Sequence, residues 1–471
     1  MHAHDAQVAR DLDLLGLPPR PWTATPPGTL DAVIIGAGMC GIAAAAALLF
    51  KGIRAIELLD EAAPGQEGPW STTARMATLR SPKHLPGIAL GIPSLTFRAW
   101  YTARHGENGW AALYKIANAD WQAYLAWLQR VLALPIRHHT PATAITQDGD
   151  RLRVETPTGP RFARHVVLAT GRLGAGGMNL PAFLAPALFP TRAAHASQPI
   201  DFTRLAGQRV AVLGANAAAF DNAATALEAG AAAVDMYCRR PTLPQVNKSR
   251  GATNPGYFEG WSALPPAERW QLMVWLHDER SPPPHESVHR VLRHEGFRLH
   301  VATPILAAHP SAQGVALDLP GRTAQADFLI AATGFEVNLA RRPELAALAP
   351  HIALWPDAYA APPALQRPEL ATYPFLGPGF ELTEKHPGAC PALARVHVFN
   401  HAAYASMGAI ASDIPGVSTA ATLLASAIAR ALFVEDRDAL HARLAAFAEP
   451  ELESTPFFAP ETLPAPLARA P

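Results

Sequence analysis

The stretch that decides the fold runs from residue 31 to residue 41 and reads Asp31-Ala32-Val33-Ile34-Ile35-Gly36-Ala37-Gly38-Met39-Cys40-Gly41. Its first half is a short apolar run typical of a buried strand, and its second half is a glycine turn. The alanine-rich residues 42–50 predict a helix, and residues 55–59 predict a second strand. Strand, glycine turn, helix and strand in this order form a dinucleotide-binding unit.

Each of the three glycines in this unit stands where a side chain would obstruct it. Gly36 makes the tight turn, Gly38 lets backbone N–H groups approach a pyrophosphate, and Gly41 lets the helix lie close to the strand. The phosphates then sit at the positive end of the helix. Asp60 follows at about the 20-residue spacing at which a carboxylate meets a ribose hydroxyl, and Glu61 is the second candidate.

The bulk composition narrows the classes of function. The 471 residues suffice for about two to four domains, and 39 basic and 39 acidic residues give a formal charge of zero. This balance argues against nucleic acid or an anionic membrane as the main partner. The three cysteines form no CxxC pair, so neither a metal site nor a redox dithiol is predicted. The start of the chain has no signal-peptide pattern, and we expect a cytoplasmic protein without a membrane partner.

The opening pattern returns in the middle of the chain. Residues 210–213 again form an apolar run, and the turn after them carries Gly214, Asn216 and Ala219 in place of the three glycines. Asn216 tolerates the backbone conformation but brings a side chain close to where a pyrophosphate would lie.

The second unit ends differently from the first. Its second strand, residues 234–238, is followed by Arg239 and Arg240 where the first unit has an acid. An arginine at this place accommodates the 2′-phosphate of NADP. We therefore interpret the unit as an NADPH site, and the alternative is a packing unit with a surface arginine pair.

Each unit is followed by an apolar strand that ends in Ala-Thr-Gly. The first strand ends at Thr170 and Gly171, and the second at Thr333 and Gly334. Such a small turn allows close backbone contact with a cofactor. A third strand, residues 396–400, is followed by two further candidates for cofactor contact before a helix begins, Gly408 and Asp413.

Two regions between these motifs remain. The loop after Asp60 contains Trp70, Arg80 and Lys83, a polar segment that is natural around a cofactor ring, the alternative being a solvated loop. Residues 242–300 are expected to form a solvated flap or to face a substrate. Four tryptophans fall at roughly helical spacing and are expected in a core: Trp100, Trp110, Trp121 and Trp127.

Two dinucleotide units, the first with an acid and the second with arginines, resemble the class B flavoprotein monooxygenases. This group includes flavin-containing, Baeyer–Villiger and N-hydroxylating monooxygenases, and the likeness spans residues 31 to about 432. Gly68-Pro69-Trp70 resembles the family's Gly-Gly-Thr-Trp, and Ala332-Thr333-Gly334-Phe335 its Ala-Thr-Gly-Tyr/Phe. Phe189-x-Thr191-x-x-x-His195-x-x-x-Pro199 resembles the signature between the two units, with Thr191 in place of its glycine.

The resemblance implies an α/β fold with two Rossmann-like domains, one for FAD and one for NADPH, the NADPH domain being inserted in the FAD domain. The corresponding boundaries are an N-terminal extension over 1–30, a first FAD part over 31–188, an NADPH domain over 189–340 with a helical excursion over 242–300, and a second FAD part with a tail over 341–471.

The resemblance also implies an FAD- and NADPH-dependent monooxygenase that uses O₂ and oxygenates a small molecule through a C4a-hydroperoxyflavin. The full Baeyer–Villiger signature is absent, which favours N- or S-oxygenation over Baeyer–Villiger oxidation of a ketone. In the family, the histidine matched by His195 couples NADPH binding to flavin chemistry, the alternative being a purely structural linker histidine. Arg80 and Lys83 are candidate catalytic donors to the flavin edge or to NADP. A flavin oxidoreductase or oxidase without oxygen insertion, and a non-catalytic nucleotide-binding protein, are the rival interpretations.

Overall fold

β1 (Leu30–Ile35) lies inside a seven-stranded sheet, and its last five residues are buried. We describe a computed structural model, which covers residues 2–410 and 413–462. The sheet runs in the order β3 (Ile136–Arg137), β2 (Ile56–Leu59), β1, β6 (Arg161–Leu168), β5 (Arg151–Glu155) and β4 (Ala144–Asp148), with β17 (Val396–Val398) beside the second half of β6. β3, β2, β1, β6 and β17 are parallel, whereas β5 and β4 form an antiparallel edge.

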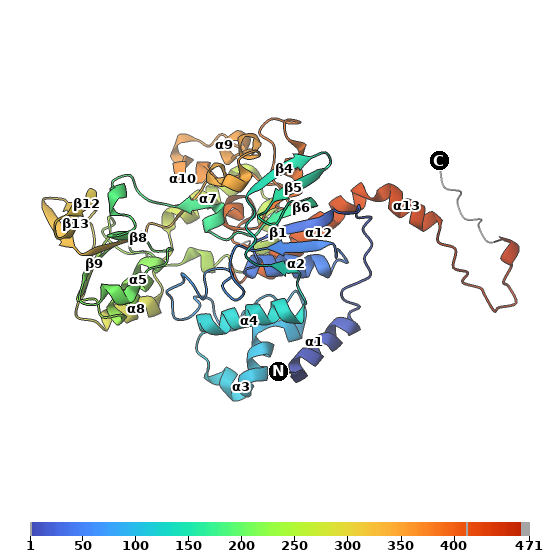
Figure 1. The fold of residues 1–471 in the computed structure, drawn as a ribbon, viewed down its shortest axis with the longest axis horizontal. Coiled ribbons are helices and arrows are strands. Elements are labelled where there is room, and N and C mark those ends of the chain that lie inside the picture. Colours follow the sequence, from blue (N-terminus) through green and yellow to red (C-terminus); the bar gives the residue numbers. More distant parts are fainter. Residues whose placement is uncertain (1, 411–412, 463–471) are drawn as a thin grey trace.

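A second sheet contains five parallel strands (Figure 1). Their order is β11 (Phe297–His300), β10 (Ala233–Tyr237), β9 (Arg209–Leu213), β15 (Phe328–Ala331) and β8 (Ala193–His195). All five lie between β6 and β17 in the chain, so the second domain is inserted in the first. The predicted α/β fold with two Rossmann-like units is confirmed, and the domain boundaries stay predictions.

Short antiparallel strands complete the inserted domain and its connection. β12 (Ala307–Ser311), β13 (Gly314–Leu319) and β14 (Arg322–Ala326) form a three-stranded sheet. β7 (Gly176–Met178) pairs with β16 (Phe335–Val337). Because β7 leads into the inserted domain and β16 leads out of it, this pair joins the two crossing segments of the chain.

Helices α2 (Met39–Leu49) and α12 (Val417–Glu435) pack against each other in the core of the first domain. By length and composition, α12 could cross a membrane. Its fully buried residues recur every three or four positions, from Val417 through Ala421, Leu424 and Ile428 to Leu432. This spacing is that of a helix with one face packed in a protein core.

Below the first sheet in Figure 1 lie α1 (His2–Leu14), α3 (Phe97–Ala112) and α4 (Asn118–Val131). Trp100, Trp110, Trp121 and Trp127 are all buried, which confirms their predicted place in the core. The remaining helices of the second half are α9 (Trp355–Ala358), α10 (Pro368–Ala371), α11 (Tyr404–Met407) and α13 (Arg437–Ala445).

The excursion after β10 contains α6 (Pro255–Gly260), α7 (Pro266–Glu279) and α8 (His285–Leu292). Trp261 and Trp270 are buried, and their indole N–H groups donate to the carbonyls of Ala405 and Leu365 at 3.2 and 2.9 Å. The prediction of a solvated flap is therefore wrong for Trp261 and for α7, because Trp261 and Trp270 join the core of the first domain, whereas α6 has no buried residue.

Candidate active site

The first glycine turn is closed so tightly that only glycine fits at two of its positions. Gly36 has a φ of +102°, and a Cβ there would lie 2.5 Å from the carbonyl oxygen of Ala169 at the end of β6. A Cβ on Gly41 would lie 1.9 Å from the carbonyl oxygen of Gly36. Because these two positions have no side chains, β1, α2 and the end of β6 can approach one another closely.

The space in front of α2 is open where a pyrophosphate would lie. Gly38 caps the helix without a side chain, and a Cβ there would meet nothing nearer than Gly68, at 3.8 Å. The N–H groups of the first turn, which have no acceptor within the helix, face this space. Trp70 follows Gly68 on the same loop and is half-buried, with its ring 6.2 Å from that of Trp121.

Asp60 lies beside this space at the end of β2. Its carboxylate accepts the N–H groups of Ala37 and Ala62 at 2.7 and 2.8 Å, and the residue is buried. Each carboxylate oxygen has a second acceptor position for a ribose hydroxyl. Glu61 is exposed. The open helix end, the side-chain-free cradle and the acid together fit the ADP part of FAD.

The ends of β6 and β17 form the next part of this cleft. Thr170 Oγ1 accepts a hydrogen bond from Asn400 Nδ2 at 3.0 Å, and Gly171 has a φ of +67°. Gly408, with a φ of +75°, lies over the ring of Trp261, where a Cβ would approach to 3.0 Å. Thr170 is therefore tied to the end of β17, and Gly408, on the segment after β17, contacts Trp261 of the excursion.

Asp413 lies near this edge, with its Oδ1 3.9 Å from Arg172. Burial raises the pKa of Asp413, and the cations Arg172 and Arg80 oppose that shift. Burial raises the pKa of Cys40, in the first turn of α2, to about 12, with a further contribution from Asp413. The start of α12 and the start of α2 thus face a common region.

The second glycine turn repeats the geometry of the first with one change. Gly214 has a φ of +115°, and a Cβ there would lie 2.6 Å from the carbonyl oxygen of Ala332, as Gly36 lies against Ala169. Asn216, however, caps α5 (Ala217–Glu228): its Oδ1 accepts from the N–H of Ala219 at 3.0 Å. One donor that a pyrophosphate would use in the first unit is therefore occupied here by a side chain.

Three arginines gather beyond the end of β10. Arg239 is exposed and Arg240 half-buried, and the turn at the end of α7 contributes Arg280. Burial lowers the pKa of Arg280, the charges of Arg240 and Arg239 lower it further, and the acids Glu369 and Asp278 oppose this. An anion such as a 2′-phosphate would be attracted by these cations, and that Arg239 and Arg240 bind it stays a prediction. Thr333 and Gly334 lie at the end of β15, where the hydroxyl of Thr333 donates to the carbonyl of Asn179.

His195 ends β8 and connects the linker to the second Ala-Thr-Gly turn. Its Nε2 lies 2.9 Å from the carbonyl oxygen of Gly334 and its Nδ1 2.7 Å from Ser197 Oγ. Burial lowers the pKa of His195, partly offset by the contact with Gly334. A neutral ring therefore donates from Nε2 to Gly334 and accepts at Nδ1. His195 contacts a predicted cofactor-binding residue, and its coupling role stays a prediction.

Arg80 and Lys83 differ in their surroundings. Arg80 Nη2 donates to Asp221 Oδ2 on α5 at 3.1 Å, so this side chain spans the two domains. The ammonium group of Lys83 donates to the carbonyls of Trp110 and Leu113 at the C-terminal end of α3. These hydrogen bonds use the donors of Lys83 to satisfy carbonyl groups at the end of α3, so we assign Lys83 no catalytic role.

The comparison with known proteins shows the family. Residues 33–253 match the family model described as pyridine nucleotide-disulphide oxidoreductase. Over 441 residues the chain is 41% identical to the FAD-dependent urate hydroxylase of Xanthomonas campestris pv. campestris, covering 92% of this chain and 93% of that protein. The chain belongs to the class B flavin monooxygenase group.

Solved structures show the same fold for this flavin monooxygenase. The ornithine hydroxylase of Pseudomonas aeruginosa matches with a TM-score of 0.67 and 18% identity, covering 86% of this chain and 100% of that chain. The L-lysine 6-monooxygenase of Pseudomonas syringae matches with 0.65 and 22%, over 86% and 99%. The flavin-containing monooxygenase of Stenotrophomonas maltophilia matches with 0.58 and 18%, over 86% and 99%. The expected family and the dependence on FAD are confirmed.

Two pockets of this flavin monooxygenase border the cleft. The first, which we term the aromatic pocket, is lined by the excursion and by the segment around α11, including Tyr257, Phe258, Trp261, Tyr404 and Gly408. The second lies between the loop after Asp60 and α8, and its lining includes Thr78, Arg80, Glu286, Ser287 and Arg290.

Sequence reasoning missed the residues that line these pockets from the inserted domain. One missed local signal is His285-Glu286-x-x-His289, which has the spacing of a zinc-binding helix. Glu286, however, accepts hydrogen bonds from Lys115 and Tyr114, at 2.7 and 3.0 Å. Residues 2–410 and 413–462 contain no group of three or more ligating side chains that could hold a metal ion. We therefore assign the motif no metal chemistry.

Proposed function

We propose that this protein is an NADPH-consuming monooxygenase that hydroxylates a carbon atom of urate or a closely related oxidised purine. The observation that carries the proposal is the 41% identity, over nearly the full length of both chains, to a protein named FAD-dependent urate hydroxylase. The solved relatives that act on ornithine and lysine, by their names, are no more than 22% identical. The comparison therefore favours a purine over an amine.

Aromatic side chains line the aromatic pocket: Tyr257, Phe258, Trp261 and Tyr404. Its volume of about 10 Å³ is too small for a purine, so a purine enters only if these side chains move apart, and their rings then offer surfaces against which a flat heteroaromatic substrate packs. Urate is an anion at neutral pH, and Arg172 lies close enough to act electrostatically on both Tyr404 and Asp413. The chemical types of these side chains, apolar rings with an arginine nearby, therefore support a planar anion as the substrate.

Each part of the chain would then have a stated task. Gly38 and Asp60 hold the ADP part of FAD, and Arg239 with Arg240 holds the 2′-phosphate of NADPH. Bound FAD would accept a hydride from NADPH and supply the activated oxygen. The apolar rings of the aromatic pocket exclude water, which would otherwise release that oxygen as peroxide.

One experiment distinguishes urate hydroxylation from N- or S-oxygenation, which the sequence favours, and from Baeyer–Villiger oxidation. Purified protein is mixed with NADPH and O₂, and NADPH loss, O₂ uptake and peroxide are measured with urate, L-ornithine, a thioether or a cyclic ketone. We expect only urate to be consumed in step with NADPH and without peroxide. Consumption of the amine, thioether or ketone instead of urate contradicts the proposal, as does peroxide formation in step with NADPH whatever substrate is added.

A further inference from the structure

A buried carboxylate of the inserted domain holds the Arg80 side chain. Asp221 lies on α5 and is 3% exposed, whereas the Arg80 side chain is 49% exposed and stands on an irregular loop. Asp221 Oδ2 accepts from Arg80 at 3.1 Å, and Oδ1 accepts from Ser287 Oγ at 2.5 Å. Arg290 adds a second cation, 3.8 Å from Oδ1. The carboxylate is thus satisfied inside the protein and fixed in position.

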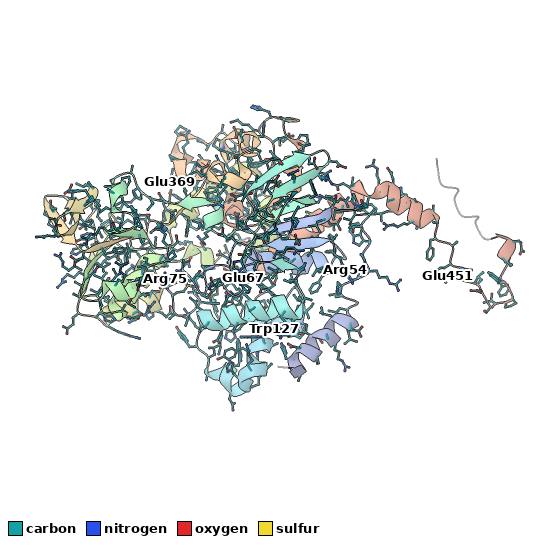
Figure 2. All side chains as sticks on the ribbon, viewed as in Figure 1. Arg54, Glu67, Arg75, Trp127, Glu369 and Glu451 are labelled. Atoms are coloured by element: carbon teal, nitrogen blue, oxygen red, sulfur yellow. The ribbon has the colours of Figure 1, made fainter. Side chains whose placement is uncertain are left out.

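Further contacts tie the same loop to the inserted domain. Arg290 donates to the carbonyl of Arg75 at 2.9 Å, and Arg75 Nη2 lies 3.4 Å from the carbonyl of Gln198, three residues after His195. Burial lowers the pKa of Arg75. In Figure 2, Arg75 lies on the α5 side of this loop and Glu67 nearer the first sheet. The segment from Arg75 to Arg80 is therefore attached to the inserted domain at both of its ends.

Arg80 also acts electrostatically on Asp413, beside the start of α12. Its positive charge opposes the rise in the pKa of that carboxyl group. One guanidinium thus pairs with α5 of the inserted domain and acts electrostatically on Asp413, a predicted flavin contact. An exposed arginine on a loop has many rotamers, and holding it in one of them costs side-chain entropy. A fixed, buried partner removes much of that freedom.

We propose that Asp221 is a positioning residue that holds Arg80 between the nucleotide and flavin sites and thereby keeps NADPH oxidation coupled to substrate hydroxylation. This inference rests on the proposed function. Asp221 contacts neither cofactor in this account and acts only through Arg80.

The test compares three substitutions and one combination. Asp221→Asn keeps the size of the side chain but removes its charge, and Arg80→Gln removes the partner. Asp327→Asn is the control, because Asp327 also belongs to the inserted domain and also pairs with an arginine, Arg209 at the start of β9, at 2.8 Å. The combined Asp221→Asn/Arg80→Gln variant tests whether the two residues act together.

We expect Asp221→Asn and Arg80→Gln each to raise the peroxide released per NADPH by about threefold or more, and the combined variant to be no worse than the more severe single one, as for residues that act as one unit. Asp327→Asn should couple like the unchanged protein. The proposal is overturned if Asp221→Asn couples like Asp327→Asn, or if the two losses add in the combined variant.

A second measurement needs no activity. Hydrogen exchange of a peptide covering residues 76–84 should quicken in Asp221→Asn but stay unchanged in Asp327→Asn, and equal exchange in both variants also overturns the proposal. If the unchanged protein does not hydroxylate urate, the proposed function fails. The exchange measurement then still decides the role of Asp221, together with the rate of flavin reduction by NADPH, which should fall in Asp221→Asn and in Arg80→Gln but not in Asp327→Asn.

Discussion

Asn216 Oδ1 accepts the backbone N–H of Ala219 at 3.0 Å, so a side chain occupies the end of α5 that corresponds to the open end of α2. Asn216 Nδ2 also donates to the carbonyl of Ala332 at 2.8 Å. The two dinucleotide units therefore differ in how many free donors they offer to a pyrophosphate.

This difference predicts the effect of Asn216→Gly. The change frees the N–H of Ala219, and we expect NADP⁺ to bind about three- to tenfold more tightly as this donor reaches the phosphate. Replacing an Asn cap by Gly costs only a few tenths of a kcal/mol of stability. Titration of the flavin absorbance with NADP⁺ measures the affinity. Asn254→Gly, which removes the same kind of cap from α6, is the control. Weaker NADP⁺ binding in Asn216→Gly would show that the asparagine itself holds the nucleotide.

The open space at Gly38 predicts a defect in FAD binding without a defect in folding. Gly38 has an ordinary φ of −73°, so alanine fits its backbone, but the added Cβ points to where the pyrophosphate would pass. We expect Gly38→Ala to lower FAD affinity by about tenfold or more, about 1.4 kcal/mol of binding free energy. Gly260→Ala, also at an ordinary φ and in open space, should bind FAD normally. Flavin content after dialysis and the far-UV spectrum measure the two properties, and full flavin content in Gly38→Ala would place the pyrophosphate elsewhere.

The arginine group beyond β10 predicts which nicotinamide nucleotide is used. Loss of a charged partner of the 2′-phosphate weakens NADPH but leaves NADH unaffected, because NADH has no such phosphate. We expect Arg239→Ala/Arg240→Ala to lower the ratio of kcat/KM for NADPH to that for NADH by about tenfold or more, which is about 1.4 kcal/mol of selectivity. The exposed Arg437, which pairs with Asp438 on α13, gives a control in Arg437→Ala. An unchanged ratio in the double variant would show that these two arginines do not bind the 2′-phosphate.

A buried histidine pair between β6 and β17 predicts how stability depends on pH. His165 Nδ1 lies 3.0 Å from His397 Nε2, and His397 Nδ1 lies 2.8 Å from the carbonyl of Gly379. Burial is the main reason that the pKa of His165 falls well below 6.5, helped by His397, Arg395 and Arg164. Burial also lowers the pKa of His397, against the opposite effects of Gly379 and Glu381.

These lowered pKa values determine whether the stability rises or falls with pH. The unfolded chain takes up protons near the ordinary histidine pKa of 6.5, while the folded pair stays neutral to lower pH. The stability from the pair is therefore complete above that pH and is lost as the pH falls toward the folded pKa, by up to about 1.4 kcal/mol per pH unit for each histidine. Urea unfolding between about pH 8 and pH 5.5 measures the slope. His165→Gln/His397→Gln should flatten it and exposed His441→Gln should not, and a slope that survives the double change would assign the effect to other groups.

The sequence predicted the local parts of the site because each is encoded over a short span. Gly36 and Gly214 are required by contacts with the ends of β6 and β15, and Gly41 by its contact with the carbonyl of Gly36. The pairing of Arg80 with Asp221 could not be predicted in this way, because 141 residues separate the two positions. Their contact exists only once the inserted domain lies against the first.

The burial of two tryptophans in the excursion could not be predicted from the sequence either. Trp261 and Trp270 are surrounded in sequence by proline and charged residues that are typical of a solvated segment. Their partners, the carbonyls of Ala405 and Leu365, come from the chain after the insertion. Lys83 is a second example. Its position after Trp70 in the sequence fits a cofactor contact, but in the fold its ammonium group donates to the carbonyl of Trp110 in α3.

The fate of molecular oxygen tests the central claim most directly. The protein is supplied with NADPH, urate and ¹⁸O₂, and the product is analysed by mass spectrometry beside the NADPH consumed. The account predicts a yellow, FAD-containing protein that puts a single ¹⁸O atom into each purine product for each NADPH oxidised. A colourless protein, or a product without ¹⁸O while NADPH is consumed and peroxide accumulates, would contradict it.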